Sequence, residues 1–332
     1  MPTPVRIGFI GAGHMAGTHM RILARDPRAR LAGVYDVSPE RARACGAPVF
    51  ESADALVDAV DAVYITLPNR LHAENALAAL ARGKHVFCEK PMTVTLHDAR
   101  RVEEAAARAA TVFQVGHNRR FAPVYQKVKA ALAEVVPLSA EFKMNRGELE
   151  NPPWTADDSV TGGYLFETPI HIFDMAAFLM GECVEVLARA EKLVYDTLDT
   201  FTALFHFASG RTATFISCAY SGWLFPFERV EVYGKHATLR TEEMDRISIA
   251  RSLAAPVEWS DYRHLPWEER WGYVTEDRLF LDSIEQSKPA AVTAADGARA
   301  VRMALAIYES ARTGAPVKVA PASLPVQEAS KQ

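Results

Sequence analysis

The chain has 332 residues, 49% of them hydrophobic and 23% charged, a composition that is typical of globular proteins and argues against extended disorder. At roughly 150 residues per domain, this length predicts about two domains. The 37 Lys and Arg residues against 41 Asp and Glu residues give a net charge of −4, so there is no basic excess for a phosphate backbone, and we do not expect nucleic acid as a partner.

Cysteine spacing and apolar runs exclude further classes of protein. Cys45, Cys88, Cys183 and Cys218 lie far apart, without the C-x-x-C pairs of thiolate zinc sites, and the histidines do not gather at metal-ligand spacings. We therefore expect reduced thiols, no bound metal and a cytoplasmic location. The apolar runs are shorter than the roughly 18 residues of a membrane span, and the first segment lacks the features of a secretory signal, so we expect no membrane partner.

The first 120 residues alternate short β-rich runs with helical segments. Apolar runs bounded by turn or cap residues predict five strands, at Val5–Ile10, Leu31–Tyr35, Ala62–Thr66, His85–Cys88 and Val112–Val115. Between them, Leu71–Arg82 predicts a helix that ends at Gly83, and Thr95 with Asp98 resembles a capping box before another helix. Such alternation builds a parallel sheet with helices on both faces, so residues 1–122 predict a doubly wound α/β domain.

The pattern changes after Pro123, where longer alternating runs begin. Within Phe201–Phe207, the three phenylalanines and Ala203 share one face of a predicted strand, and the residues between them share the other. Further strands are expected at Thr212–Ala219, Glu228–Tyr233 and Thr238–Thr241, and helices at Tyr125–Glu134, Asp277–Gln286 and Asp296–Arg312. Residues 123–332 therefore predict an α+β domain with a large, mostly antiparallel sheet.

An antiparallel sheet of this kind commonly packs helices on one face and leaves the other face open. A broad open face with Phe, Leu and Ile side chains favours aggregation unless another subunit covers it. We therefore expect the second domain, residues 123–332, both to bind substrate and to form a homodimer or homotetramer through its sheet.

A glycine-rich turn follows the first predicted strand. The segment Gly11–Ala16, with the sequence GAGHMA, has the GxGxxA pattern that opens a helix in Rossmann dinucleotide-binding domains. Gly11 permits the tight turn, Gly13 lets the backbone approach a pyrophosphate, and the small last residue allows close packing of helix and strand. The amide groups of the first helical turn, at His14 and Met15, then face the phosphates.

Asp36 ends the second predicted strand about 20 residues beyond the glycine turn, as in NAD-binding sites. A carboxylate at this position hydrogen-bonds the ribose hydroxyl groups and repels a 2′-phosphate. The residues that follow, Val37, Ser38 and Pro39, include no arginine, and Arg41 is expected in the first turn of the next helix. We therefore expect NAD rather than NADP; the alternative is that Asp36 only caps that helix.

Three more segments carry a further pattern. The sequence TLPN with a following histidine (residues 66–72) ends one strand, Glu89-Lys90-Pro91 ends the next, and the second domain contains GGYLFETPIHIFD at residues 162–174. Together with the glycine turn, these segments resemble the Gfo/Idh/MocA family, which includes glucose–fructose oxidoreductase and inositol dehydrogenase. The resemblance extends over nearly the whole chain and includes VGHNRRF at residues 115–121 and YESARTG at residues 308–314.

The residue types are consistent with redox chemistry. Ligands of an open α/β sheet lie outside the carboxyl ends of its strands, where Lys90 can reach a group beside the nicotinamide; the alternative is an ordinary surface lysine. Glu167, His171 and Asp174 are spaced so that on a helix they share one face. A histidine held by a carboxylate presents its other nitrogen as a base, and the alternative is a structural histidine with a carboxylate partner.

The resemblance implies a role for each residue. Hydride would pass between NAD and a secondary alcohol, His171 would accept the hydroxyl proton, Lys90 would hydrogen-bond the reacting oxygen, and Asp174 would orient His171 or hold a neighbouring hydroxyl. The implied cofactor-binding residues are Gly11, Gly13, His14, Met15, Asp36, Thr66, Pro68, Asn69, His72, Glu89, Lys90 and Asn118. The implied substrate-binding residues are Lys90, Asn118, Trp154, Glu167, His171 and Asp174.

Part of the second domain departs from the family pattern. The family commonly has DxGxH before the histidine, whereas this chain has Glu167-Thr168-Pro169-Ile170-His171. Glutamate keeps the charge but reaches one methylene further, and proline fixes φ and removes an N–H, so we expect substrate orientation to differ. Trp154 is predicted to stack on a sugar, with a packing anchor or subunit contact as the alternative. Trp267 and Trp271 are expected in the core or at an interface.

These observations predict an NAD-dependent dehydrogenase or reductase that acts on the hydroxyl or carbonyl groups of a sugar, sugar derivative or cyclitol. A second hypothesis, drawn from the resemblance, is an enzyme that holds NAD tightly and cleaves a glycosidic bond through transient oxidation. A third is a regulator that binds NAD and a sugar without catalysis. Regulatory relatives often lack the lysine or the histidine, and this chain has both Lys90 and His171.

Overall fold

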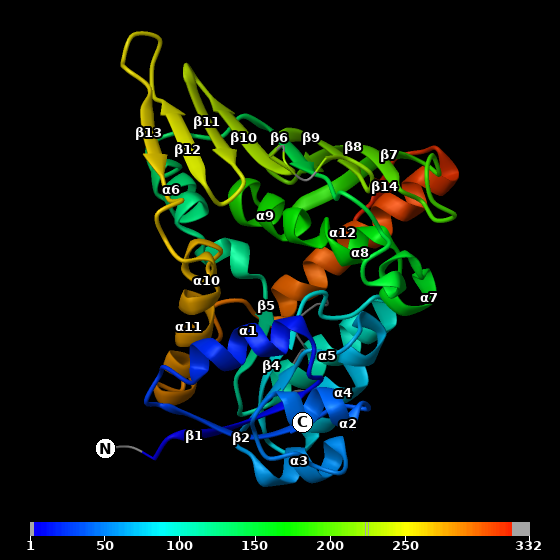
Figure 1. Ribbon diagram of the computed structural model, residues 1–332. Helices are drawn as coiled ribbons and strands as arrows, with labels where there is room; N and C mark the ends of the chain where they lie inside the picture. The colour runs from blue at the N-terminus through cyan, green and yellow to red at the C-terminus, as the bar shows by residue number, and fades with distance from the viewer. Residues whose placement is uncertain (1–2, 223, 225, 321–332) are drawn as a thin grey trace, which may run out of the picture.

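Two β-sheets and their helices make up the protein in the computed structural model, which describes residues 3–222, 224 and 226–320 (Figure 1). The first sheet contains five parallel strands in the order β2-β1-β3-β4-β5. These strands are β1 (Val5–Ile10), β2 (Ala29–Tyr35), β3 (Ala62–Ile65), β4 (His85–Glu89) and β5 (Phe113–Gly116). The predicted doubly wound parallel sheet is therefore confirmed.

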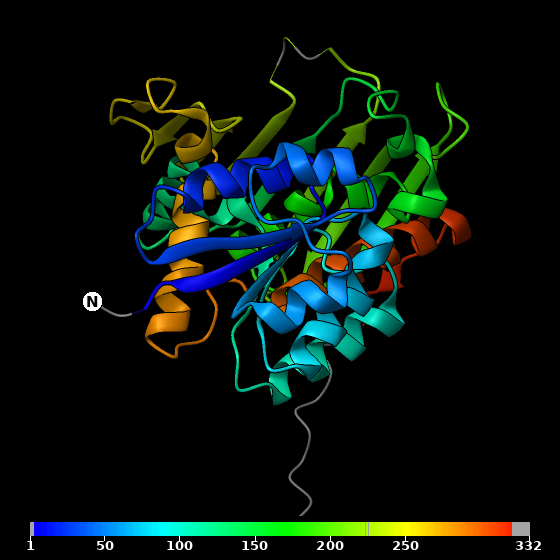
Figure 2. The same ribbon diagram turned by 60° about the horizontal axis from the view of Figure 1, so that its bottom comes forward.

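Helices cover both faces of the five-stranded sheet (Figure 2). On one face, α1 (His14–Leu23) and α2 (Pro39–Ala44) pack over Phe9, Tyr64 and Phe87, whose buried rings stack on one another. On the other face, the covering helices are α3 (Ala53–Ala59), α4 (His72–Ala81) and α5 (Leu96–Arg108). Strands that are apolar on both sides require this double cover, because neither face can remain in water.

The second sheet contains nine strands in the order β13-β12-β11-β10-β6-β9-β8-β7-β14, and only the β6–β9 pair among these described strands is parallel. Its strands are β6 (Ser139–Met144), β7 (Cys183–Glu191), β8 (Thr200–Phe207), β9 (Thr212–Cys218), β10 (Glu228–Gly234), β11 (Ala237–Glu242), β12 (Arg246–Ala250), β13 (Glu258–Asp261) and β14 (Val317–Lys318). The predicted large, mostly antiparallel sheet is confirmed. Five of its strands were not predicted from the sequence, namely β6, β7, β12, β13 and β14.

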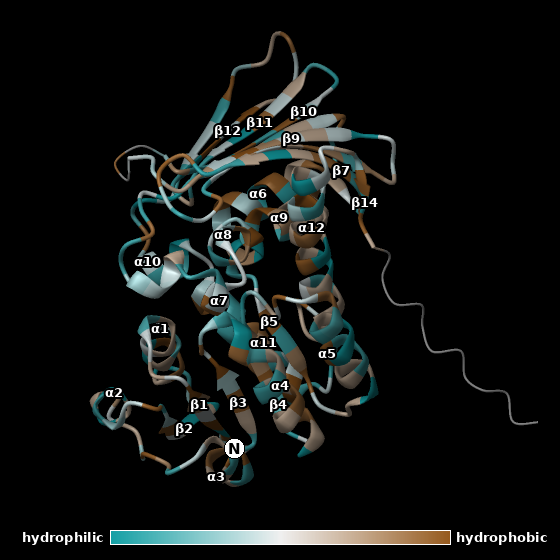
Figure 3. Cartoon of the chain, turned by 90° about the vertical axis from the view of Figure 1, so that its right-hand side faces the viewer, coloured by the Kyte–Doolittle hydropathy of each residue, from teal (hydrophilic) through white to brown (hydrophobic). Residues whose placement is uncertain are grey.

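Helices pack on one face of the nine-stranded sheet (Figure 3). These helices are α6 (Pro123–Ala131), α9 (Ile170–Met180) and α12 (Ala294–Thr313). The alternation expected for β8 is confirmed, because its phenylalanines and Ala203 are buried on this face. The opposite face carries exposed apolar side chains, and Leu187, Leu204 and Ile216 are 39%, 45% and 53% exposed.

Short helical segments from both parts of the chain gather near the carboxyl ends of the parallel strands. They are η1 (Asn69–Leu71), η2 (Asn118–Phe121), η3 (Pro153–Ala156), α7 (Asp158–Thr161), α8 (Tyr164–Glu167) and α10 (Trp267–Arg270). The longer α11 (Tyr273–Glu285) packs against α1, and α12 packs against α5. We propose a domain boundary between residues 122 and 123. Although α11 lies beyond this boundary, its Phe280 and Leu281 pack on the first sheet and complete its cover.

Candidate active site

The glycine-rich turn lies between β1 and α1. Gly11 has a φ of +98°, and a Cβ there would lie 2.5 Å from the carbonyl oxygen of Thr66, so the position requires glycine. The Thr66 hydroxyl donates a hydrogen bond to the carbonyl oxygen of Gly11 at 2.9 Å. Gly13 caps α1 without a side-chain hydrogen bond, and a Cβ on Gly13 would meet no described atom within 4 Å. The first amides of α1, at His14 and Met15, and the open approach to Gly13 therefore fit the phosphates of a dinucleotide.

Asp36 follows β2 and holds this turn through its carboxylate. Oδ2 accepts the backbone N–H of Ala12 at 2.8 Å, and Oδ1 accepts the N–H of Ser38 at 2.8 Å and the guanidinium of Arg41 at 2.9 Å. Burial by itself raises the pKa of Asp36, but these donors outweigh burial and lower the pKa. The carboxylate is therefore charged, as an acceptor for ribose hydroxyl groups should be. Arg41 lies in the first turn of α2, as expected, and its side chain extends back to the end of β2.

Two residues implied in cofactor binding, Asn69 and His72, form hydrogen bonds that connect loops. His72 is buried at the start of α4, and its Nδ1 and Nε2 each lie 2.7 Å from a backbone carbonyl oxygen, of Pro91 and Leu67 respectively. The side-chain amide of Asn69 donates to the carbonyl oxygen of Thr161 at 2.9 Å. His72 therefore joins the loops after β3 and β4, and its role in cofactor binding stays a prediction.

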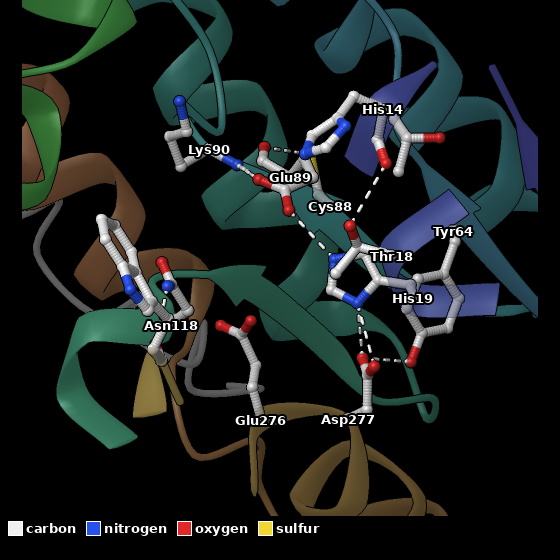
Figure 4. A network of polar contacts seen from close by, with 12 residues as sticks. His14, Thr18, His19, Tyr64, Cys88, Glu89, Lys90, Asn118, Glu276 and Asp277 are labelled. Atoms are coloured by element: carbon white, nitrogen blue, oxygen red, sulfur yellow. Dashed lines mark hydrogen bonds and ion pairs between the residues drawn. The ribbon is translucent and has the colours of Figure 1, made fainter. Parts of the chain in front are cut away.

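Glu89 and Lys90 lie at the end of β4 and point in different directions (Figure 4). The Glu89 carboxylate is buried, with Oε1 3.0 Å from Nε2 of His19 and with Oε2 accepting the backbone N–H of Lys90 at 3.0 Å. The Lys90 side chain extends away from Glu89, and its Nζ donates to the carbonyl oxygen of Glu167 at 2.9 Å. The ammonium thus reaches from the first sheet to α8, the segment that leads into His171.

The Glu167 side chain, which stands where the family commonly has aspartate, is fixed by Arg146. Nη1 of Arg146 donates to Oε1 of Glu167 at 3.1 Å and to the hydroxyl of Thr168 at 3.3 Å, and Nε donates to the carbonyl oxygen of Glu148. Pro169 directly precedes α9, where its fixed φ is compatible with the start of a helix. The longer carboxylate therefore ends in an ion pair with the loop after β6.

His171 lies in the first turn of α9 and is 5% exposed. Its Nε2 lies 3.2 Å from Nη1 of Arg119, and its Nδ1 has no hydrogen-bond partner in the described part of the chain. Because a guanidinium only donates, Nε2 is the acceptor and the neutral ring carries its hydrogen on Nδ1. Burial lowers the pKa of His171 well below its ordinary value, and the positive charges of Arg119 and Lys90 lower it further. The imidazole is therefore neutral at physiological pH, the form that can accept a proton.

Asp174 lies one turn beyond His171 but pairs with a different residue. Its carboxylate accepts two hydrogen bonds from Nε and Nη2 of Arg120, at 2.8 and 2.6 Å, and this guanidinium also lies 3.1 Å from Asp296 at the start of α12. Asp174 and Arg120 are both buried. This arrangement corrects the expectation that Asp174 orients His171, because α9 directs the carboxylate to η2, where a bidentate partner is available.

The structure adds His117 and Trp271 to the expected site residues and shows what Asn118 contacts. His117 follows β5 with its ring centroid 6.2 Å from that of His171, and both of its ring nitrogens lack a partner among the described residues. Asn118 donates to the carbonyl oxygen of Trp271 at 2.8 Å, and the Trp271 ring centroid lies 4.6 Å from the guanidinium carbon of Arg119. Asn118 and Trp271 are 153 positions apart, so no local pattern indicates that they meet.

The remaining expected residues lie at the margins of this region. Pro68 immediately precedes η1, and Trp154, on η3, is 39% exposed. The ring of Trp267, on α10, has its centroid 6.4 Å from that of His14 and 5.8 Å from that of Trp271. A tryptophan expected in the core or at an interface therefore lies beside the glycine turn.

Other features lie outside the candidate site. A cavity of about 830 Å³ lies between α5 and the segment that joins α11 to α12, and none of the expected site residues lines it.

Within residues 3–222, 224 and 226–320, no three His, Cys, Asp or Glu side chains lie close enough together to hold a metal ion. In the same described ranges, every helix is too short or too polar to cross a membrane.

Comparison with known proteins defines the class. Residues 5–117 match the family model described as "Oxidoreductase family, NAD-binding Rossmann fold", and residues 131–319 match the one described as "Oxidoreductase family, C-terminal alpha/beta domain". The chain therefore belongs to the Gfo/Idh/MocA family of oxidoreductases, which confirms the resemblance seen in its motifs.

Individual relatives match along nearly their full length. The chain is 27% identical to the myo-inositol 2-dehydrogenase of Thermotoga maritima, over 95% of this chain and 98% of the relative. It is 31% identical to the inositol 2-dehydrogenase of Rubrobacter xylanophilus, over 95% of this chain and 93% of the relative. Its fold resembles that of levoglucosan dehydrogenase in complex with NADH and levoglucosan, with a TM-score of 0.89 and 22% identity over 96% of this chain and 100% of that one.

Proposed function

We propose that this oxidoreductase is an NAD-dependent dehydrogenase or reductase that acts on a secondary hydroxyl or carbonyl group of a sugar, sugar derivative or cyclitol. One observation carries the proposal: Lys90, at the end of a strand of the dinucleotide-binding sheet, reaches the segment before His171 and is close enough to lower the pKa of that imidazole. An amine and a neutral imidazole in one place are the groups that such a reaction requires. The inositol dehydrogenases among the relatives support the substrate class.

The residues of the first domain fit a dinucleotide. The α1 amides at His14 and Met15 would hold the diphosphate, Gly13 would allow its approach, and Asp36 would accept the ribose hydroxyl groups. We propose NAD rather than NADP because the charged Asp36 would repel a 2′-phosphate. When bound, the nicotinamide supplies the hydride acceptor in oxidation or the hydride donor in reduction.

Lys90 and His171 would divide the handling of charge and proton. The Lys90 ammonium would leave the carbonyl oxygen of Glu167 and donate a hydrogen bond to the reacting oxygen, where it would stabilise negative charge as it develops. His171 would take the hydroxyl proton at Nε2, the nitrogen that carries the lone pair, and would return a proton from the same nitrogen in carbonyl reduction. Arg119 now occupies Nε2, so substrate binding must move the guanidinium aside before His171 can act.

Substitution of the two residues tests the proposal. A set of sugars and inositols is assayed with NAD and with NADP by the absorbance of the reduced cofactor, and NADH binding is measured by fluorescence. Lys90→Met and His171→Asn should each lower turnover by about 10²–10⁴-fold while NADH still binds. Lys288→Met and His97→Asn, which replace exposed residues of the same types, should leave turnover unchanged. Wild-type turnover in Lys90→Met and His171→Asn would reject the proposed roles, and product release from a glycoside without net NADH formation would favour the glycoside-cleaving hypothesis.

We also propose that the open face of the nine-stranded sheet forms a homodimer or homotetramer interface. Leu187 and Leu204 are cross-strand neighbours on this face, and Ile216 lies on the next strand, so their exposed side chains form one apolar area. Leu204→Glu should give monomers by light scattering with an unchanged circular dichroism spectrum, and an unchanged mass would reject this interface. The four unpaired cysteines support a cytoplasmic location.

A further inference from the structure

A fully buried histidine lies below the turn that carries Lys90 (Figure 4). His19, on α1, has a carboxylate at each ring nitrogen: Nε2 lies 3.0 Å from Oε1 of Glu89, and Nδ1 lies 2.8 and 3.0 Å from the two oxygens of Asp277. A ring that donates at both nitrogens carries both hydrogens and a positive charge. Burial by itself lowers the pKa of His19, but Asp277 and Glu89 raise it well above its ordinary value.

This histidine joins three elements that are far apart in sequence. Glu89 ends β4, Asp277 lies on α11, and His19 lies on the helix whose first turn faces the dinucleotide site. The outer carboxylate, Asp277, also accepts a hydrogen bond from the Tyr64 hydroxyl at 3.1 Å. The inner carboxylate, Glu89, uses its second oxygen to accept the backbone N–H of Lys90. Hydrogen bonds therefore run without interruption from α11 through His19 to the backbone of the lysine.

One more ionisable side chain enters the same region from α11. Glu276 is fully buried, and neither of its carboxyl oxygens has a hydrogen-bond partner in the described chain. Burial raises the pKa of Glu276 well above its ordinary value, so the side chain is a neutral acid. Glu276 thus lies beside the charged cluster without bonding to Glu89 or His19, which makes it a natural control.

We propose that His19 is a positioning residue for the reaction: by holding the Glu89 carboxylate, it fixes the Lys90 backbone relative to the glycine turn at the start of α1. His14 and His19 lie on one helix, so the diphosphate site and the reacting amine are connected by a rigid helix and two hydrogen bonds. The position of the Lys90 backbone relative to the glycine turn is then set by the contact between Glu89 and His19. This inference rests on the proposed function, because it concerns the same lysine.

Turnover measurements separate positioning from general stability. His19→Leu should lower kcat by about 100-fold, because a misplacement of about 1 Å costs that much, with little change in sugar KM or in NADH affinity. His19→Gln, which keeps a donor for one carboxylate, should recover part of kcat, and it replaces His19→Leu if the latter does not fold. Glu276→Gln should keep wild-type kcat. Equal losses in His19→Leu and Glu276→Gln would overturn the proposal.

A double-mutant cycle tests whether His19 acts through Lys90. In the Lys90→Met background, His19→Leu should cause little further loss of kcat, because the group that it positions is absent. Losses that multiply would show that His19 acts by another route and would overturn the proposal.

A readout without turnover keeps this inference distinct from the proposed function. Lys90 is partly buried, and its labelling by an acylating reagent, measured by mass spectrometry on the ligand-free protein, should be several-fold faster in His19→Leu and unchanged in Glu276→Gln. If the wild-type protein oxidises no sugar or cyclitol, the proposed function fails while this measurement still reports on positioning. Equal labelling rates in the wild type and His19→Leu would overturn the proposal.

Discussion

The cofactor half and the substrate half of the candidate site are held together by different kinds of contact. In the cofactor half, Asp36 accepts the backbone N–H groups of Ala12 and Ser38, and the Thr66 hydroxyl donates to the carbonyl oxygen of Gly11. These contacts use main-chain groups in short segments around the glycine turn. They join the ends of adjacent parallel strands, which this fold always brings together, and the motifs of the fold therefore predict them.

In the substrate half, buried ion pairs connect segments from different parts of the chain. Arg120 pairs with Asp174 and lies near Asp296, while Arg119 on the same segment donates to Glu228 of β10. A buried charge that loses its partner is costly, because the remaining ion stays desolvated. Substitutions in the cofactor half should therefore change ligand choice, whereas substitutions in the substrate half should first change stability.

The largest effect is expected where a buried ion pair of the substrate half is broken. Asp174→Asn leaves the buried Arg120 guanidinium with Asp296 as its remaining close carboxylate and should lower the free energy of unfolding by about 3–5 kcal/mol. Urea unfolding followed by fluorescence measures this loss. Asp196→Asn, at an exposed aspartate, is the control and should change little. A loss below about 1 kcal/mol, the range of an exposed pair, would contradict the contrast between the halves.

The next effect concerns ligand choice in the cofactor half. Asp36→Ala removes the charge that disfavours a 2′-phosphate and frees the nearby Arg41, so the ratio of kcat/KM for NADP to that for NAD should rise about 10–100-fold. The double variant Asp36→Ala/Arg41→Ala should lose most of this gain. A wild-type preference for NADP, or an unchanged ratio in Asp36→Ala, would contradict the role given to Asp36.

A smaller effect is expected on the pH dependence of kcat/KM, through His171 in the substrate half. Below the pKa of His171, the imidazole is protonated and cannot accept a proton, so the acidic limb of kcat/KM for oxidation should report this group. Burial first, and then the charge of Arg119, hold the pKa low. Arg119→Met removes that charge, so the acidic limb should move to higher pH. A limb that stays in place would assign it to another group.

The smallest effect is expected on the pH dependence of stability, through the buried Glu276 of α11. Its folded pKa lies above the unfolded value of 4.5, so the folded protein keeps a proton that the unfolded chain releases. Stability is therefore lost as the pH rises from the unfolded toward the folded pKa. The melting temperature of the wild type should fall more between about pH 5 and pH 8 than that of Glu276→Gln. Parallel curves would show that the folded pKa of Glu276 is not raised above its unfolded value.

The same contrast explains how much could be predicted from the sequence. Both sheets, the glycine turn and the position of Lys90 follow from strand periodicity and short motifs, which depend on neighbouring residues. The partners of Asp174 and Asn118 could not be predicted, because spacing along a helix shows which residues share a face but not what lies opposite. His72 illustrates the same limit, since no motif indicates that its two ring nitrogens lie against the carbonyl oxygens of Pro91 and Leu67.

The place of α11 has a consequence for how this chain is made. Phe280 and Leu281 of α11 complete the apolar face formed by Tyr64 and Phe87, so that layer is finished by residues near the end of the sequence. During synthesis, this face is fully covered only after residue 281 has left the ribosome, because α1 and α2 cover just part of it. A truncated product ending near residue 122 would therefore leave the α11 side of Tyr64 and Phe87 in contact with water.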